Sequence, residues 1–100
     1  MGLMGASISL IVPVYNEGSL LSRSLRDFYD WLSRYPAKAE LIVVTDGSRE
    51  PTLAVVSGII ESFRGGKVLT SWVRFSENRG KGAAVRAGAA RSMGDIIAFL

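Results

Sequence analysis

The stretch ISLIVPVYNE (residues 8–17) decides the fold, because an apolar, β-branched run meets a proline and then a group of polar residues. A short apolar run such as 8–12 is typical of a strand that is buried on both faces of a sheet. Pro13 is expected to end this strand and to present the loop that follows it. A strand of this kind needs helices on both sides of its sheet, and the rest of the sequence predicts them.

The same plan of strand and helix repeats outward from this stretch. Large apolar residues at helical spacing predict an amphipathic helix over about 18–34, which ends before Pro36. The further elements are expected as strands over 41–44, 68–75 and 96–100 and as helices over 53–63 and about 82–92. This alternation predicts an α/β fold, Rossmann-like, with three α/β/α layers, a mostly parallel sheet and right-handed crossovers. We expect an N-terminal tail at 1–7 and one domain portion over 8–100.

The composition limits the chemistry that this chain can supply. The 100 residues are 48% hydrophobic and contain neither cysteine nor histidine, which excludes disulfides, thiolate sites and histidine ligands. Carboxylates, hydroxyls, amides, lysine and arginine remain. The net charge of +3 fits a solvated basic surface or an anionic partner. No apolar run approaches the roughly 20 residues of a membrane span, so the chain alone is expected to be soluble.

Polar and unusual residues follow three of the expected strands. They form the stretches PVYNE (13–17), TDGS (45–48) and SENRGKG (76–82). In an open parallel sheet, ligands bind beyond the carboxyl ends of the strands. These three loops are therefore expected to lie along one edge and to form one binding site.

Two residues after the second strand have alternative interpretations. Asp46 could accept hydrogen bonds from the N–H groups of a uracil or guanine, or could form an Asx turn or cap the next helix. Ser48 has the same alternatives, and capping is favoured because Glu50 and Pro51 resemble a helix start.

The loop after the first strand is equally open to two interpretations. Tyr15 could stack on a base or pack over the strand edge. Glu17 could bind a ribose hydroxyl or the base, or could be an acid in the first helical turn that complements the helix dipole. Asn16 has the character of an ordinary N-cap.

The stretch Gly80-Lys81-Gly82 opens the third helix. Its glycines allow close approach of the backbone, and a helix N-terminus beside a lysine favours phosphate. The stretch lacks the spacer and the hydroxyl residue of a Walker A loop, and a flexible turn with a solvated Lys81 is the alternative. Arg79 and Arg86 flank it, and Arg91 is expected on a basic outer face.

Taken together with their spacing, four stretches resemble an inverting family 2 glycosyltransferase of the GT-A fold. They are IVPVYNE (11–17), ELIVVTDGS (40–48), ENRGKGAAVRAG (77–88) and GDIIAFL (94–100), and they cover nearly the whole chain. The third is most similar to the branch that loads polyprenyl phosphates, which includes dolichyl-phosphate glucose and mannose synthases.

The resemblance implies a nucleotide-sugar-binding portion of such an enzyme. Asp46 would bind the base, and Lys81 with its loop would lie near the diphosphate. The candidate nucleotide-sugar-binding residues are Pro13, Tyr15, Asn16, Glu17, Asp46, Ser48, Gly80, Lys81 and Gly82. The sequence departs from the family pattern at Thr45, where aspartate is frequent, and at Glu50 and Pro51.

The resemblance further implies a parent enzyme that transfers sugar from a UDP- or GDP-sugar, with inversion, to an acceptor such as a polyprenyl phosphate. Mg²⁺ or Mn²⁺ would be held by an Asp-x-Asp motif beyond Leu100, so no catalytic or metal-binding residue is assigned and little turnover is expected from these residues. We expect the parent protein in the cytoplasm, at the cytoplasmic face of a membrane.

Two other functions compete with this interpretation. One is a non-catalytic α/β module that binds a nucleotide or phosphate, and the sequence after Leu100 would distinguish it. The other is a nucleic-acid binder that uses the arginines from Arg79 to Arg91. Interspersed acidic residues disfavour the latter, and no nucleic-acid partner is expected.

Overall fold

Strands and helices alternate along the chain in the computed structural model, which describes residues 5–100. In chain order the elements are β1 (Ile8–Val14), α1 (Leu21–Ser33), β2 (Ala39–Asp46), α2 (Thr52–Ser62), β3 (Leu69–Phe75), α3 (Lys81–Arg91) and β4 (Ile96–Phe99). All strand pairs of the described chain are parallel, in the order β3-β2-β1-β4. The expected α/β fold with a parallel sheet is therefore confirmed.

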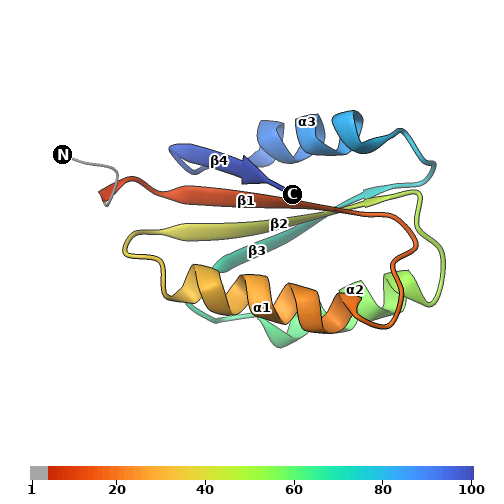
Figure 1. Ribbon diagram of the computed structural model, residues 1–100, viewed down its shortest axis with the longest axis horizontal. Coiled ribbons are helices and arrows are strands. Elements are labelled where there is room, and N and C mark those ends of the chain that lie inside the picture. Colours follow the sequence, from red (N-terminus) through yellow and green to blue (C-terminus); the bar gives the residue numbers. More distant parts are fainter. Residues whose placement is uncertain (1–4) are drawn as a thin grey trace.

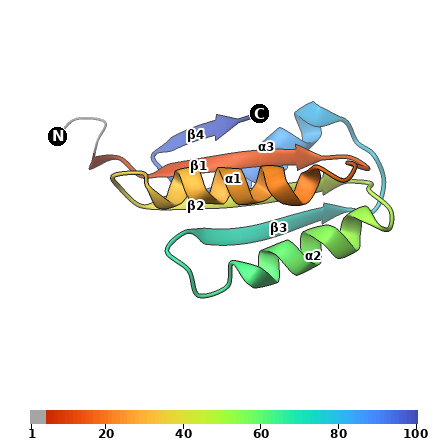
Figure 2. The same cartoon turned by 60° about the horizontal axis from the view of Figure 1, so that its bottom comes forward.

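The helices cover both faces of the sheet, which makes three layers. Figures 1 and 2 show α1 and α2 on one face and α3 on the other. The rings of Tyr29 and Phe63 stack with centroids 4.1 Å apart and join α1 to α2. On the opposite face, Ala84 of α3 packs against the buried Ile11 and Ile42. Because β1 and β2 are central, their apolar side chains are buried on both faces.

The first strand is longer than expected, and the prediction that Pro13 ends it is wrong. β1 continues to Val14, and Pro13 pairs with Val44 of β2. Ile11 accepts a hydrogen bond from the Leu100 amide on the β4 side. Backbone groups two residues along a strand face the same way, so the nitrogen of Pro13 also faces that side. The pairs of β1 with β4 within the described residues involve residues 8–11, so none of them needs an N–H from Pro13.

The other helix and strand boundaries differ from the predicted ones by a few residues. α1 starts at Leu21 instead of 18, and β2 runs on to Asp46, so Asp46 is the last residue of a strand. Of the tail expected over 1–7, residues 1–4 lie outside the described residues. Ser7 is tied to the start of β4, since its hydroxyl accepts a hydrogen bond from the Asp95 amide at 3.0 Å.

A buried polar cluster fixes the start of β4 at the amino-terminal edge of the sheet. Glu40 accepts hydrogen bonds from the Ser9 hydroxyl at 2.7 Å and from the Met93 amide at 2.9 Å. The Ser9 oxygen in turn accepts from the Gly94 amide at 2.8 Å. These bonds hold the turn between α3 and β4 against β1 and β2. No helix within residues 5–100 is long and apolar enough to cross a membrane.

Two helical glycines should respond oppositely to alanine. Gly58 of α2 has open space around its Cα, so Gly58→Ala should raise the free energy of unfolding by about 0.5–1 kcal/mol. A Cβ at Gly88 of α3 would collide with the buried Ile11 side chain, so Gly88→Ala should lower it by about 1–3 kcal/mol. Urea unfolding of both variants measures the difference. A stabilising Gly88→Ala would contradict the close packing of α3 on the sheet.

Candidate functional site

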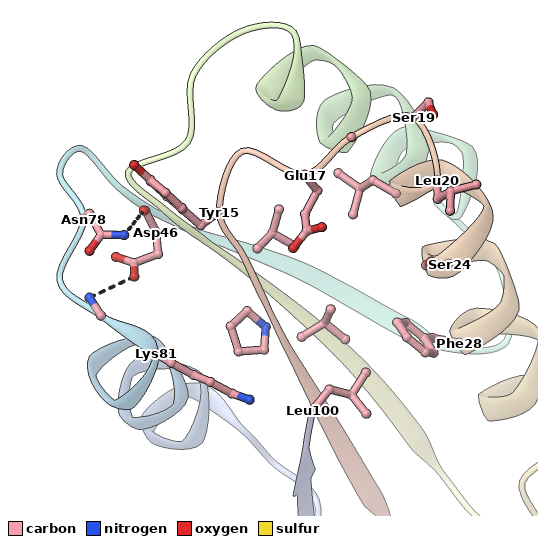
Figure 3. A pocket seen from close by; sticks show the side chains of 16 residues that line it. Tyr15, Glu17, Ser19, Leu20, Ser24, Phe28, Asp46, Asn78, Lys81 and Leu100 are labelled. Atoms are coloured by element: carbon pink, nitrogen blue, oxygen red, sulfur yellow. Dashed lines mark hydrogen bonds between the residues drawn. The ribbon is translucent and has the colours of Figure 1, made fainter.

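A pocket of about 760 Å³ lies at the carboxyl ends of the strands. It lies beside the end of β1, beyond residues 8–11, which pair with β4. Figure 3 shows the start of α1 on one side of it and the loop before α3 on the other. Its lining consists of Val12, Pro13, Val14, Tyr15, Glu17, Gly18, Ser19, Leu20, Leu21, Ser24, Phe28, Asp46, Asn78, Gly80, Lys81 and Leu100.

The expected convergence is found, since residues from the ends of β1, β2 and β3 line one pocket. Among the candidates, Pro13, Tyr15, Glu17, Asp46, Gly80 and Lys81 line it. Asn16, Ser48 and Gly82 do not. The pocket therefore brings carboxylates, an aromatic ring and a lysine together from three separate stretches of sequence.

The carboxylate of Asp46 is buried and holds the loop that precedes α3. Its Oδ1 accepts a hydrogen bond from the Arg79 amide at 2.6 Å, and its Oδ2 accepts one from the Gly80 amide at 2.9 Å. The side-chain amide of Asn78 donates to the backbone oxygen of Asp46 at 3.2 Å (Figure 3). The interpretation of Asp46 as a cap of the following helix is wrong, because α2 has no side-chain cap.

Gly47 allows the end of β2 and the loop before α3 to approach each other closely. Its φ is +75°, and a Cβ there would collide with the backbone of Glu77 and Asn78. Its amide donates to the Phe75 oxygen at 3.2 Å. Any side chain at this position would push the loop away from Asp46.

Asn16 and Ser48 link two loops instead of capping helices. The Ser48 hydroxyl donates to the Val14 oxygen at 3.2 Å and accepts from the Asn16 amide at 3.1 Å. The Asn16 side-chain oxygen accepts from the Arg49 amide at 2.8 Å. The predicted caps are wrong because α1 and α2 begin several residues later, after Leu20 and Pro51, where no side chain caps the helix.

Tyr15 and Glu17 are the exposed groups of the loop after β1. Tyr15 is 52% exposed, so much of its ring remains accessible beside the pocket. Glu17 precedes α1, whose first turn contains no acidic residue, so the interpretation of Glu17 as a first-turn acid is wrong. Its side chain is exposed and lines the pocket (Figure 3).

Lys81 is the first residue of α3 and extends into the pocket (Figure 3). The residue before it, Gly80, has a φ of +94°, which turns the chain sharply into the helix. No carboxylate within residues 5–100 forms a salt bridge with Lys81. Its ammonium group and the free N–H groups of the first turn thus offer positive potential to an anion. Gly82 lies instead beneath the guanidinium of Arg86.

Some lining residues were not singled out from the sequence as site residues. Asn78 lies in a stretch that was expected to contribute, yet carried no assigned role. Leu21 and Phe28 form part of the helical apolar stripe, which predicts core packing and gives no signal for a pocket wall. Leu100 also lines the pocket.

Thr45 is a departure from the family pattern that the structure explains. Its side chain is fully buried, and its hydroxyl accepts a hydrogen bond from the indole nitrogen of Trp72 at 2.9 Å. Thr45 does not line the pocket. The hydrogen bond from Trp72 of β3 therefore explains why residue 45 carries a hydroxyl group.

The site as described can accept N–H donors and hold an anion. Asp46 and Glu17 supply acceptor oxygens, Tyr15 an aromatic surface and Lys81 a positive charge. No group of three carboxylates that could hold a metal ion occurs within residues 5–100. The residues described here therefore favour recognition of a ligand with a base-like end and an anionic end.

Comparison with known proteins gives a family match over almost the whole chain. The family model "Glycosyl transferase family 2" matches residues 9–100. The dolichyl-phosphate beta-glucosyltransferase of Drosophila melanogaster is 36% identical over 97 residues, which cover 92% of this chain and 29% of that protein. The dolichyl-phosphate beta-glucosyltransferase of Homo sapiens is 35% identical over 95 residues, which cover 90% of this chain and 29% of that protein.

A solved structure shares the arrangement of the elements. The mannosyltransferase of Pyrobaculum calidifontis in complex with GDP-Man and Mn²⁺ superposes with a TM-score of 0.78 at 25% sequence identity. The match covers 93% of this chain and 26% of that one. The chain thus spans less than a third of the length of these relatives.

Loss of the Ser48 hydroxyl should loosen the loop that carries Tyr15 and Glu17. Ser48→Ala removes a partner from the Asn16 amide and the Val14 oxygen, and should lower the free energy of unfolding by about 1–3 kcal/mol. The Asn16 amide should also exchange its proton with solvent faster. Ser57→Ala, at an exposed position inside α2, is the matched control and should raise stability by no more than about 0.5 kcal/mol through helix propensity. Equal stability of the two variants would contradict the linking role of Ser48.

Proposed function

The chain belongs to glycosyl transferase family 2, and we propose that its pocket binds the nucleotide of a UDP- or GDP-sugar. The observation that carries this proposal is the convergence of three strand ends on one pocket. Asp46, Tyr15 and Lys81 come from three different loops and line the same cavity. A nucleoside diphosphate offers a base, a ribose and an anionic diphosphate, which match these three kinds of group.

Each end of the ligand has a chemically suited partner. The carboxylate of Asp46 accepts hydrogen bonds only, so it suits the N–H edge of uracil or guanine. The accessible ring of Tyr15 suits stacking on the base. Glu17 suits the ribose hydroxyls. Lys81 and the start of α3 suit the diphosphate, because both carry positive potential.

The remaining candidates support the loops instead of facing the pocket. Asn16 and Ser48 hold the loop after β1 to the loop after β2. Gly82 leaves room for the guanidinium of Arg86 beside the first turn of α3. We therefore propose residues 8–100 as the nucleotide-sugar-binding portion of a glycosyltransferase, with these three residues acting indirectly.

For the whole protein we propose transfer of the sugar with inversion, to an acceptor such as a polyprenyl phosphate, at the cytoplasmic face of a membrane. The dolichyl-phosphate glucosyltransferases among the relatives support the acceptor class. Mg²⁺ or Mn²⁺ would stabilise the charge on the leaving diphosphate when bound. The described residues contain no cluster for such an ion, so we expect its ligands elsewhere in the protein.

Direct titration tests the proposal. The intact protein should bind UDP-glucose or GDP-mannose in the presence of Mn²⁺, as measured by isothermal titration calorimetry. UMP and GMP should compete with the corresponding sugar nucleotide, because they share the base and ribose. The proposal fails if no nucleotide sugar binds.

A comparison of two basic residues of α3 localises the diphosphate. Lys81→Gln removes the charge that lines the pocket and should raise the dissociation constant for the nucleotide sugar about tenfold, which corresponds to about 1.4 kcal/mol. Arg91→Gln removes the same charge at the other end of α3 and should change the constant less than about twofold, because solvent and salt screen distant charges. Equal effects of the two variants would refute the placement of the diphosphate at Lys81.

A further inference from the structure

Both oxygens of the Asp46 carboxylate already accept hydrogen bonds from the protein backbone in the absence of a ligand. It is 4% exposed, and each of its two oxygens accepts a backbone hydrogen bond, from Arg79 and from Gly80. A buried carboxylate without partners would be strongly unfavourable, so these two charge-assisted bonds are what make its burial tolerable. Loss of either bond would therefore leave a buried carboxylate oxygen without its partner and would also release a backbone amide of the loop.

The same two amides lie immediately before the lysine of the pocket. Gly80 is held at both of its backbone groups, since its amide donates to Asp46 and its carbonyl accepts the first helical bond from the Ala84 amide. Its φ of +94° sets the direction in which Lys81 leaves the loop. Within residues 5–100, no other side chain accepts a hydrogen bond from the Arg79 or Gly80 amide.

Two further contacts hold the loop before α3 at the same end of the sheet, and neither of them involves Lys81. The Asn78 side chain donates to the backbone of Asp46, and the Arg79 guanidinium lies over the Phe75 ring at 4.6 Å. Both contacts act upstream of Gly80. The two bonds to the Asp46 carboxylate are thus the last fixed points before the helix begins.

We propose that Asp46 is a positioning residue for Lys81: its carboxylate fixes the Arg79 and Gly80 amides, and this places Lys81 and the start of α3 for the diphosphate. The inference rests on the proposed function for the identity of the ligand. It extends that function, because Asp46, which suits the base of the nucleotide, would also determine how tightly the diphosphate binds.

Hydrogen exchange tests the structural half of the inference without any ligand. In the intact protein, the Arg79 and Gly80 amides should be protected from exchange. Asp46→Asn has nearly the same shape, but its NH₂ group cannot accept a hydrogen bond, so at least one of the two amides should lose its protection. Asp95→Asn is the matched control, because Asp95 also accepts a backbone amide bond, from Ser7, at the far end of the sheet. Unchanged protection in Asp46→Asn would overturn the inference.

Ligand binding tests the functional half. Asp46→Asn should weaken binding of inorganic pyrophosphate, measured with Mn²⁺ in the intact protein, by about tenfold. Asp95→Asn should leave it unchanged. Weaker binding of uridine or guanosine together with unchanged pyrophosphate binding would overturn the inference, because that pattern shows contact with the base alone.

A double-mutant cycle separates positioning from general destabilisation. If Asp46 acts through Lys81, Asp46→Asn should reduce pyrophosphate affinity much less in a Lys81→Gln background than in the wild type. Additive effects would overturn the inference. If Asp46→Asn does not fold, Asp46→Ser is the second variant: its hydroxyl is one bond shorter than the carboxylate, so both amides should lose their protection. If the wild type binds neither nucleotide nor pyrophosphate, the proposed function fails, and the exchange experiment still decides the positioning role.

Discussion

The site depends on the parallel pairing of β1 with β2 in the buried centre of the sheet. The register sets Val14 beside Thr45, so the loops that follow these two strands begin next to each other. β3 joins β2 with Phe75 beside Asp46, which brings a third loop to the same edge. A shift of β2 by one residue would turn Asp46 to the opposite face of the sheet, away from the loop that it holds.

The pocket lies at the end of β1, between the start of α1 and the loop before α3. Val12, Pro13 and Val14 of β1 line it, and Pro13 pairs with Val44 of β2. Proline has no backbone N–H, so the nitrogen of Pro13 leaves no unpaired donor at this wall of the pocket. At the other end of the sheet, the buried cluster around Glu40 holds the start of β4 against β1 and β2.

Polar residues at the strand ends mostly bind one another across loops. Ser48 and Asn16 connect the first two loops, and Asp46 connects the end of β2 with the loop before α3. These bonds satisfy backbone groups that lie at the ends of buried strands, where water has limited access. The loops are therefore ordered by one another, and within residues 5–100 the side chains of Tyr15, Glu17 and Lys81 form no hydrogen bond or salt bridge and remain available at the pocket.

The sequence by itself determined the class of fold, the order of the elements and the edge at which the polar loops gather. Apolar strands and amphipathic helices reveal these features because hydrophobic periodicity is a local property of the chain. The family motifs also lie in consecutive residues, so most of the pocket candidates, such as Glu17 and Lys81, could be named. Only the tertiary structure decided what Asp46, Ser48 and Asn16 bind, how far β1 runs past Pro13, and that α1 forms a wall of the pocket. The hydrogen-bond partners of Asp46, Ser48 and Asn16 lie more than thirty residues away along the chain, and a hydrogen bond between distant loops leaves no periodic signal in the sequence.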